Sequence, residues 1–196
     1  GDEILAIILC GSVNARSKRP QTDKLFEDII NASKKLNFQR PIIGSFPNLE
    51  MNTVPHIKIV QFIEKNIKNF QPDYIYTHHP NDLNDDHYQV SKACMAATRL
   101  FQRVKNIKRI KGLYYMEILS STEWSLNPSN NFNPNYFINI EDTIKRKLEA
   151  LSLYTDVIRQ KPHPRSKECI ESLSIFRGAQ SGYLNAEAFQ VGFQTD

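Results

Sequence analysis

The chain has 196 residues, 40% of them hydrophobic, and a formal net charge of +4. That length suits one domain with a substantial core, and no apolar run approaches the length of a membrane span. The positive charge is mild and no nucleic-acid motif with interleaved aromatic residues is present, so we expect no nucleic-acid partner. The three cysteines are far apart in the sequence, which predicts reduced thiols in a cytoplasmic protein.

Apolar runs of strand length alternate with segments of helical periodicity. Residues 4–9 are continuously apolar, which is typical of a strand buried on both faces of a parallel sheet. Apolar residues recur at helical spacing in 22–36 and 55–70. In chain order we expect strand 4–9, helix 22–36, strand 41–44, helix 55–70, strand 74–76, a helix ending near 103, strand 112–118, a long loop over 120–135, strand 137–140, helix 141–159 and a last helix ending near 178. This alternation predicts an α/β fold with a parallel sheet and helices on both faces.

A polar loop follows the predicted strand 74–76 and leads into the next helix. Residues 77–87 hold three of the five histidines and three aspartates. Ligands of open α/β sheets bind at the carboxyl ends of strands, and imidazole with carboxylate is what a hydrolytic zinc site needs. His87, which follows Asp85 and Asp86, is therefore a candidate metal ligand. A cluster that only caps a helix and forms salt bridges is the alternative for the same residues.

The sequence of this loop resembles a motif of a known family. The string His-His-Pro-Asn-Asp-Leu-Asn-Asp-Asp-His at 78–87 closely resembles the second motif of the LmbE-like, or PIG-L, family of zinc-dependent N-deacetylases. Further segments resemble the family in the expected order, at 1–4, 11–16, 46–48, 120–124, 132–135, 162–166 and 186–189. Of these, 120–124 and 132–135 are similar to the branch that acts on sugars.

The resemblance implies a Rossmann-like, three-layer fold with a mainly parallel sheet, one zinc ion, and hydrolysis of the acetamide of an N-acetylated amino sugar. It implies that His87 is a zinc ligand and that Asp86 is its oriented neighbour or part of a relay. The family's other two ligands and its catalytic base come from a His-Pro-Asp-Asp motif, which this chain does not contain. We therefore expect residues 1–196 to be a single deacetylase domain without its first strand, motif and helix, the missing ligands lying upstream of Gly1.

Other polar residues are weaker candidates, each with a structural alternative. His163 is a candidate for acting on the leaving amine or for a structural turn, and Trp124 for stacking on a sugar or for packing over the core. Asn84 takes the place of a histidine that some family members have three residues before the third ligand. The candidates for substrate binding are Arg16, Asn84, Trp124, Arg165, Ser166 and Glu187, against the alternatives of surface salt bridges for Arg16 and Glu187 and a helix cap for Ser166.

The predicted function is thus a metal-dependent hydrolase that removes the N-acetyl group from an amino sugar or glycoconjugate of the N-acetylglucosamine type. Its substrate would be a small-molecule, lipid-linked or nucleotide-linked amino sugar in glycan or cell-surface polysaccharide synthesis. A catalytically inactive sugar-binding homologue or a truncated fragment of the enzyme is the alternative, and a homo-oligomer is left open. A different enzyme on a similar sheet is disfavoured because the chain has neither a dinucleotide-binding glycine motif nor a P-loop.

Overall fold

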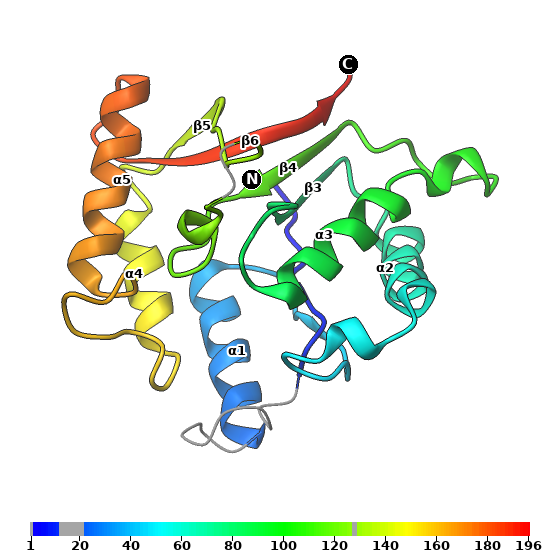
Figure 1. Cartoon of the computed structure of the whole chain (residues 1–196), viewed down its shortest axis with the longest axis horizontal. Coiled ribbons are helices and arrows are strands. Elements are labelled where there is room, and N and C mark those ends of the chain that lie inside the picture. Colours follow the sequence, from blue (N-terminus) through cyan, green and yellow to red (C-terminus); the bar gives the residue numbers. More distant parts are fainter. Residues whose placement is uncertain (1, 12–21, 127–128) are drawn as a thin grey trace. The chain divides into compact units, whose positions relative to one another are not determined.

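The computed structural model describes residues 2–11, 22–126 and 129–196. Figure 1 labels the helices and strands of the chain. The chain divides into two compact units. The first unit comprises Gly1–Asn48 and Ile138–Glu187, and the second comprises Leu49–Phe137 and Ala188–Asp196.

The first unit combines a parallel strand pair with three helices. The strands are β1 (Ile7–Ile8) and β2 (Ile42–Ile43), and the helices are α1 (Thr22–Leu36), α4 (Ile144–Ser152) and α5 (Lys167–Ser181). Helix α1 packs against α4, and α4 contacts α5. The predicted apolar stripe of α1 is seen in the burial of Ile29 and Ala32. Helix α1 also carries a buried aspartate, Asp28. Its carboxylate accepts a hydrogen bond from the Thr155 amide at 2.9 Å and forms an ion pair with Lys24 at 3.1 Å.

The second unit stacks two helices on a sheet. Helix α2 (His56–Phe70) packs on α3 (Asp85–Ala97), and α3 packs on strand β3 (Tyr74–His78). The predicted stripe of α2 is confirmed by the complete burial of Ile59 and near-complete burial of Ile63 and Ile67. Short 3-10 turns are η1 (Met51–Thr53), η2 (Leu100–Gln102) and η3 (Thr122–Trp124).

The four-stranded sheet has the order β3-β4-β6-β5. Strand β4 (Gly112–Met116) runs parallel to β3, with Tyr74 opposite Gly112 and His78 opposite Met116. Strand β6 (Ala186–Gln194) runs antiparallel to β4, and β5 (Tyr136–Asn139) completes the order. The α/β class is confirmed, but this sheet is mixed and not mainly parallel. The sequence analysis did not predict β6, because Ala186, Ala188 and Gly192 interrupt its strand-favouring residues Phe189, Val191 and Phe193.

Other predicted elements differ mainly in length. The helix expected over 141–159 is α4, which ends at Ser152, and the helix expected to reach 103 is α3, which ends at Ala97. Tyr114 and Tyr115 of β4 are both buried. None of the helices in the described part of the chain is long and apolar enough to cross a membrane.

Candidate functional site

The polar loop lies where the sequence placed it, between the carboxyl end of β3 and the start of α3. Asn84 is the N-cap of α3, because its side-chain oxygen accepts a hydrogen bond from the Asp86 amide at 3.0 Å. Asp85 and Asp86 occupy the first turn, where negative charge is favourable to the helix dipole. This cap starts the helix immediately before His87 and places His87 in its first turn.

His87 is held on one side of its ring and partly exposed. Its Nδ1 lies 3.0 Å from Oδ1 of Asp82 and 3.3 Å from the hydroxyl of Ser121. The side chain of His87 is 23% exposed, whereas that of Asp82 is fully buried. Within the described residues, the second ring nitrogen, Nε2, makes no hydrogen bond or ion pair. His87 therefore has one engaged nitrogen and one available to bind a ligand.

Asp82 is the centre of a buried hydrogen-bond network. Its Oδ1 accepts the Asn84 amide at 2.9 Å in addition to His87, and its Oδ2 accepts the hydroxyls of Ser121 and Thr122, both at 2.8 Å. Burial acts to raise the pKa of the Asp82 carboxyl, but the hydrogen bonds from His87, Asn84 and Ser121 outweigh it, so the pKa lies below its ordinary value. Asp82 is thus an ionised carboxylate that only accepts hydrogen bonds.

Two further histidines of the loop, the half-buried His78 and the buried His79, lie beside this network. The ring of His78 stacks on that of His87, with centroids 4.0 Å apart and an interplanar angle of 14°. Burial, with His87 as a smaller cause, lowers the pKa of His78 to about 3, so this ring is neutral at physiological pH. His79 is 2% exposed and meets the rings of Tyr115 and Phe132 edge to face. Both histidines are therefore uncharged side chains beside the network. The ring of His78 covers one face of the His87 ring.

Asp86, the predicted neighbour or relay of His87, is also buried. Its Oδ2 accepts the Leu49 amide at 2.6 Å and its Oδ1 accepts the Met51 amide at 3.2 Å, which ties η1 to the first turn of α3. The carboxylate that contacts His87 in the structure belongs to Asp82. The relay role of Asp86 stays a prediction.

The loop after β4 carries Trp124 next to the buried network. Ser121 and Thr122, which hold Asp82, lie in the turn that ends at Trp124, and the Trp124 amide donates to the Ser121 carbonyl at 3.2 Å. The side chain of Trp124 does not pack over the core, because the residue is 52% exposed. An exposed indole in this turn is available to stack on a ligand.

The other candidates in the described part of the chain belong to the first unit and are His163, Arg165, Ser166 and Glu187. Their observed contacts are structural ones. Ser166 is buried and caps α5 by accepting the Cys169 amide at 3.2 Å. His163 accepts the Arg165 amide on its Nδ1 at 3.0 Å, and Glu187 forms an ion pair with Lys147. Substrate contacts of these four residues remain predictions. Arg16 lies outside the described residues.

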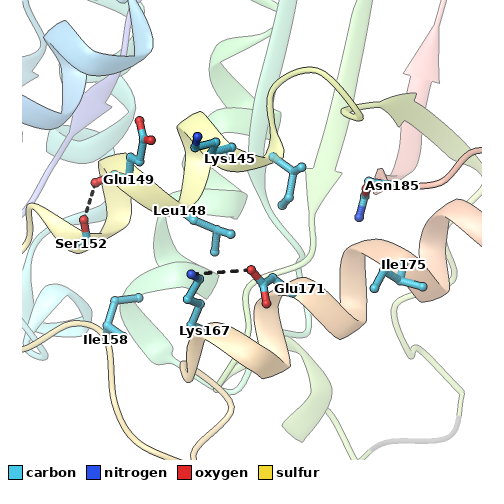
Figure 2. Close-up of a pocket in the computed structure, with 10 residues that line it drawn as sticks. Lys145, Leu148, Glu149, Ser152, Ile158, Lys167, Glu171, Ile175 and Asn185 are labelled. Atoms are coloured by element: carbon cyan, nitrogen blue, oxygen red, sulfur yellow. Dashed lines mark hydrogen bonds and ion pairs between the residues drawn. The ribbon is translucent and has the colours of Figure 1, made fainter.

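A hollow in the first unit lies between α4 and α5 and has a volume of about 620 Å³ (Figure 2). Its walls include Leu148 and Ile175, and the Lys167–Glu171 ion pair, 3.9 Å long, lies at its side. None of the described site candidates is among the residues that line it. The hollow is therefore separate from the predicted chemistry.

Sequence reasoning missed the parts played by Asp82, Ser121 and Thr122. Three aspartates precede His87 within five residues. Their spacing alone does not show which of them contacts His87. The two hydroxyl residues come from a segment about 40 positions later. The available signal was the presence of Ser-Ser-Thr at 120–122, just after the neighbouring predicted strand, since the ends of parallel strands meet at one sheet edge.

A metal ion needs more ligands than this network offers. The described residues contain no group of three or more His, Cys, Asp or Glu side chains that could hold a metal ion. A catalytic zinc site uses three protein ligands and a water. His87 fits one such ligand, because metal-bound histidines commonly donate a hydrogen bond from their other ring N–H to a carboxylate. The described chain thus fits a contribution to a metal site but does not fit a complete one.

The carboxylate–histidine pair lies after the carboxyl end of β3, which is where ligands bind in open α/β sheets. Residues 11–98, which include the pair, match the family model described as PIG-L: GlcNAc-PI de-N-acetylase. This match confirms, at the family level, the resemblance to the PIG-L, or LmbE-like, family that the motifs of the chain indicated.

A curated relative covers more of the chain at low identity. It is a tRNA-2-methylthio-N(6)-dimethylallyladenosine synthase of Lachnoclostridium phytofermentans, 24% identical over 183 residues, which are 89% of this chain and 35% of that protein. The chain therefore spans about a third of the length of this relative.

Solved structures share the fold at lower identity still. A conserved protein of Thermus thermophilus has a TM-score of 0.77 at 16% identity, covering 99% of this chain and 83% of its own. The N,N'-diacetylchitobiose deacetylase of Pyrococcus horikoshii has a TM-score of 0.69 at 14% identity, covering 95% and 71%. The 4-carboxy-2-hydroxymuconate hydratase of Pseudomonas putida has a TM-score of 0.74 at 14% identity, covering 99% and 85%. These likenesses confirm the Rossmann-like α/β fold, which hosts more than one activity.

Proposed function

We propose that this chain is part of a metal-dependent N-deacetylase that hydrolyses the acetamide of an N-acetylated amino sugar or glycoconjugate. The observation that carries the proposal is the contact of His87 with the buried Asp82, 3.0 Å long, inside the segment that matches the family. A carboxylate that holds one nitrogen of a histidine is the usual companion of a metal-ligating imidazole.

Zinc is the proposed metal, with His87 as one of its ligands. Imidazole is a good zinc ligand, and a bound zinc lowers the pKa of water and polarises carbonyl groups. The further ligands are proposed to lie on a part of the protein outside residues 1–196. Within the chain, Asp82 orients His87, and the stacked, neutral His78 keeps water from one face of the ring.

The proposed substrate class is N-acetylglucosamine in free, lipid-linked or nucleotide-linked form. The description of the matched family model is GlcNAc-PI de-N-acetylase, and one protein of similar structure is a diacetylchitobiose deacetylase. The exposed indole of Trp124, in the turn that holds Asp82, supports a sugar ligand, because an aromatic face can cover the apolar face of a sugar ring. We propose that the protein acts in glycan synthesis in the cytoplasm.

The direct test is amine release by the complete protein. The protein would be loaded with zinc and assayed on N-acetylglucosamine, diacetylchitobiose and uridine-diphosphate-N-acetylglucosamine, before and after removal of the metal with a chelator. We expect release of glucosamine-type amine from at least one of the three, loss of this activity with chelator and recovery with zinc. Absence of amine release from all three, and from a lipid-linked N-acetylglucosamine, by protein with full metal content would refute the proposal.

A sugar-binding protein without catalysis is the second candidate. The exposure of Trp124 supports a sugar-binding protein as much as an enzyme, because stacking on a sugar needs no metal. Calorimetric binding of the same three sugars without amine release would select this candidate.

A further inference from the structure

The protonation pattern of His87 decides what this residue can do. A neutral imidazole carries its single proton on one nitrogen and a lone pair on the other. Only the nitrogen with the lone pair can bind a metal or take up a proton. The hydrogen-bond partners of one nitrogen therefore fix the function of the other.

The two hydrogen-bond neighbours of Nδ1 can both only accept a hydrogen bond, so they favour a proton on this nitrogen. Oδ1 of Asp82, at 3.0 Å, belongs to a carboxylate that only accepts. The hydroxyl of Ser121, at 3.3 Å, already donates its hydrogen to Oδ2 of Asp82, so it offers only lone pairs to the ring. Placing the proton on Nε2 instead would set the Nδ1 lone pair against a carboxylate lone pair.

Asp82 cannot easily turn away from this arrangement. Its two oxygens accept the Asn84 amide and the hydroxyls of Ser121 and Thr122 as well as His87. Thr122 is fixed in turn, because its hydroxyl oxygen accepts the Ile118 amide at 2.8 Å. Rotation of the fully buried carboxylate would leave these donors unpaired, which is costly in the interior.

We propose that Asp82 is a positioning residue that keeps the proton of neutral His87 on Nδ1, and that Ser121 and Thr122 hold Asp82 in place for this task. The Nε2 lone pair is thereby kept available for a metal or a proton. The inference deepens the proposed function, on which its value for catalysis rests.

The network distinguishes two substitutions of Asp82. In Asp82→Asn the carboxamide oxygen can replace Oδ1 beside the Asn84 amide and His87, while its NH2 group donates to the hydroxyl oxygens of Ser121 and Thr122. That variant is expected to retain the Nδ1 proton. Asp82→Ala removes the acceptor, so His87 is expected to shift towards the tautomer with its proton on Nε2. Asp85→Ala is the matched control, because Asp85 is an exposed carboxylate of the same loop whose recorded side-chain contact is with Gln89.

The test is nitrogen NMR of the complete protein labelled with 15N-histidine and freed of metal with a chelator, near pH 8.5, where unperturbed imidazoles (pKa about 6.5) are neutral. The His87 signals are assigned by their loss in His87→Ala, and the chemical shifts of the two ring nitrogens show which one carries the proton. We expect the Nδ1–H form in the wild type, Asp82→Asn and Asp85→Ala, and a shift of His87 towards Nε2–H in Asp82→Ala.

A wild-type His87 with its proton on Nε2 overturns the inference, as does a folded Asp82→Ala protein that keeps the Nδ1–H form. If Asp82→Ala does not fold, the wild-type tautomer remains decisive, together with an Nδ1 proton resonance that is visible in water because Asp82 shields it. If the tautomer is as expected and no N-acetyl sugar is hydrolysed, the proposed function fails while the inference stands.

Discussion

Histidine and aspartate occur in both units of the chain, but their surroundings give them different properties. In the second unit, Nδ1 of His87 faces a buried carboxylate, Asp82. In the first unit, Nδ1 of His163 accepts the backbone amide of Arg165 at 3.0 Å, so a neutral His163 carries its proton on Nε2. His163 can therefore donate a hydrogen bond from Nε2, whereas His87 can present a lone pair there. The same residue type thus suits a donor role in one unit and a ligand role in the other.

The two buried aspartates differ in a similar way. Asp82 accepts hydrogen bonds from a histidine and two hydroxyls, whereas Asp28 pairs with Lys24 and the Thr155 amide. Asp28 thus fastens a segment that follows α4 to helix α1. Asp82 instead joins two loops around a side chain that is partly exposed, which is the arrangement expected of a functional site.

The largest expected effect is on activity. His87→Ala in the complete protein should abolish amine release and lower the zinc content, with a loss well beyond the roughly 10- to 100-fold typical of residues that only support a ligand. The fold should survive, since the ring is partly exposed. Activity, metal content and a circular-dichroism melt are measured together.

His56→Ala is the matched control for this prediction. His56 begins α2 in the same unit, and its replacement should leave activity and zinc content near wild type. Equal losses in the two variants would show that histidine removal acts through general damage to the unit.

The next largest effect is on the stability of the second unit. Asp82→Ala leaves the hydroxyls of Ser121 and Thr122, and the Asn84 amide, without their shared acceptor. We expect a loss of about 2–4 kcal/mol in the free energy of unfolding, measured by urea denaturation. Asp85→Ala should cost less than about 0.5 kcal/mol, as expected of an exposed position. Similar losses for the two would mean that the network adds nothing to stability.

The pH dependence of the unfolding free energy tests how much the Asp28 carboxylate stabilises the first unit. Burial acts to raise the pKa of Asp28, but the Thr155 amide and Lys24 outweigh it, so the pKa lies below its ordinary value. The ionised carboxylate therefore stabilises the fold above the unfolded-state pKa of about 3.9, and this contribution is lost as the pH falls through the folded-state pKa. The difference in unfolding free energy between the wild type and Asp28→Asn should shrink below about pH 4. A difference that is constant between neutral and acid pH would contradict this reading.

Ser166→Ala should have a moderate effect on the first unit. Its hydroxyl caps α5, and the loss of such a cap costs about 1 kcal/mol of stability. Thermal unfolding measures the change, with Ser181→Ala at the other end of the same helix as a comparison. Weaker sugar binding at unchanged stability would instead support the predicted substrate contact of Ser166.

The smallest expected change in stability is that of Trp124→Ala. The indole is 52% exposed, so the unfolding free energy should change by no more than about 0.5 kcal/mol. Binding of N-acetylglucosamine derivatives should weaken by about fivefold, as expected for the loss of one aromatic contact of about 1 kcal/mol. Calorimetric titration that finds unchanged affinity would remove Trp124 from the proposed sugar site.

The sequence alone determined the parts of this protein that depend on near neighbours. Helices α1 and α2 follow from apolar residues at helical spacing, because one stripe of each helix is buried. The loop before α3 was recognisable because its ligand-type residues follow a strand and its residues 78–87 resemble a family motif. Residue 87 was singled out for the same reasons.

Only the tertiary structure decided which carboxylate serves His87 and how the sheet is completed. Asp82, Asp85 and Asp86 are equivalent in composition. Asp82 is selected because the turn at Asn84 brings it back to His87, while Ser121 and Thr122 arrive from a distant loop. Strand β6 pairs antiparallel with β4 across a long separation in sequence, with Gly112 opposite Gln194. Such contacts depend on the packing of remote segments, which local periodicity does not encode.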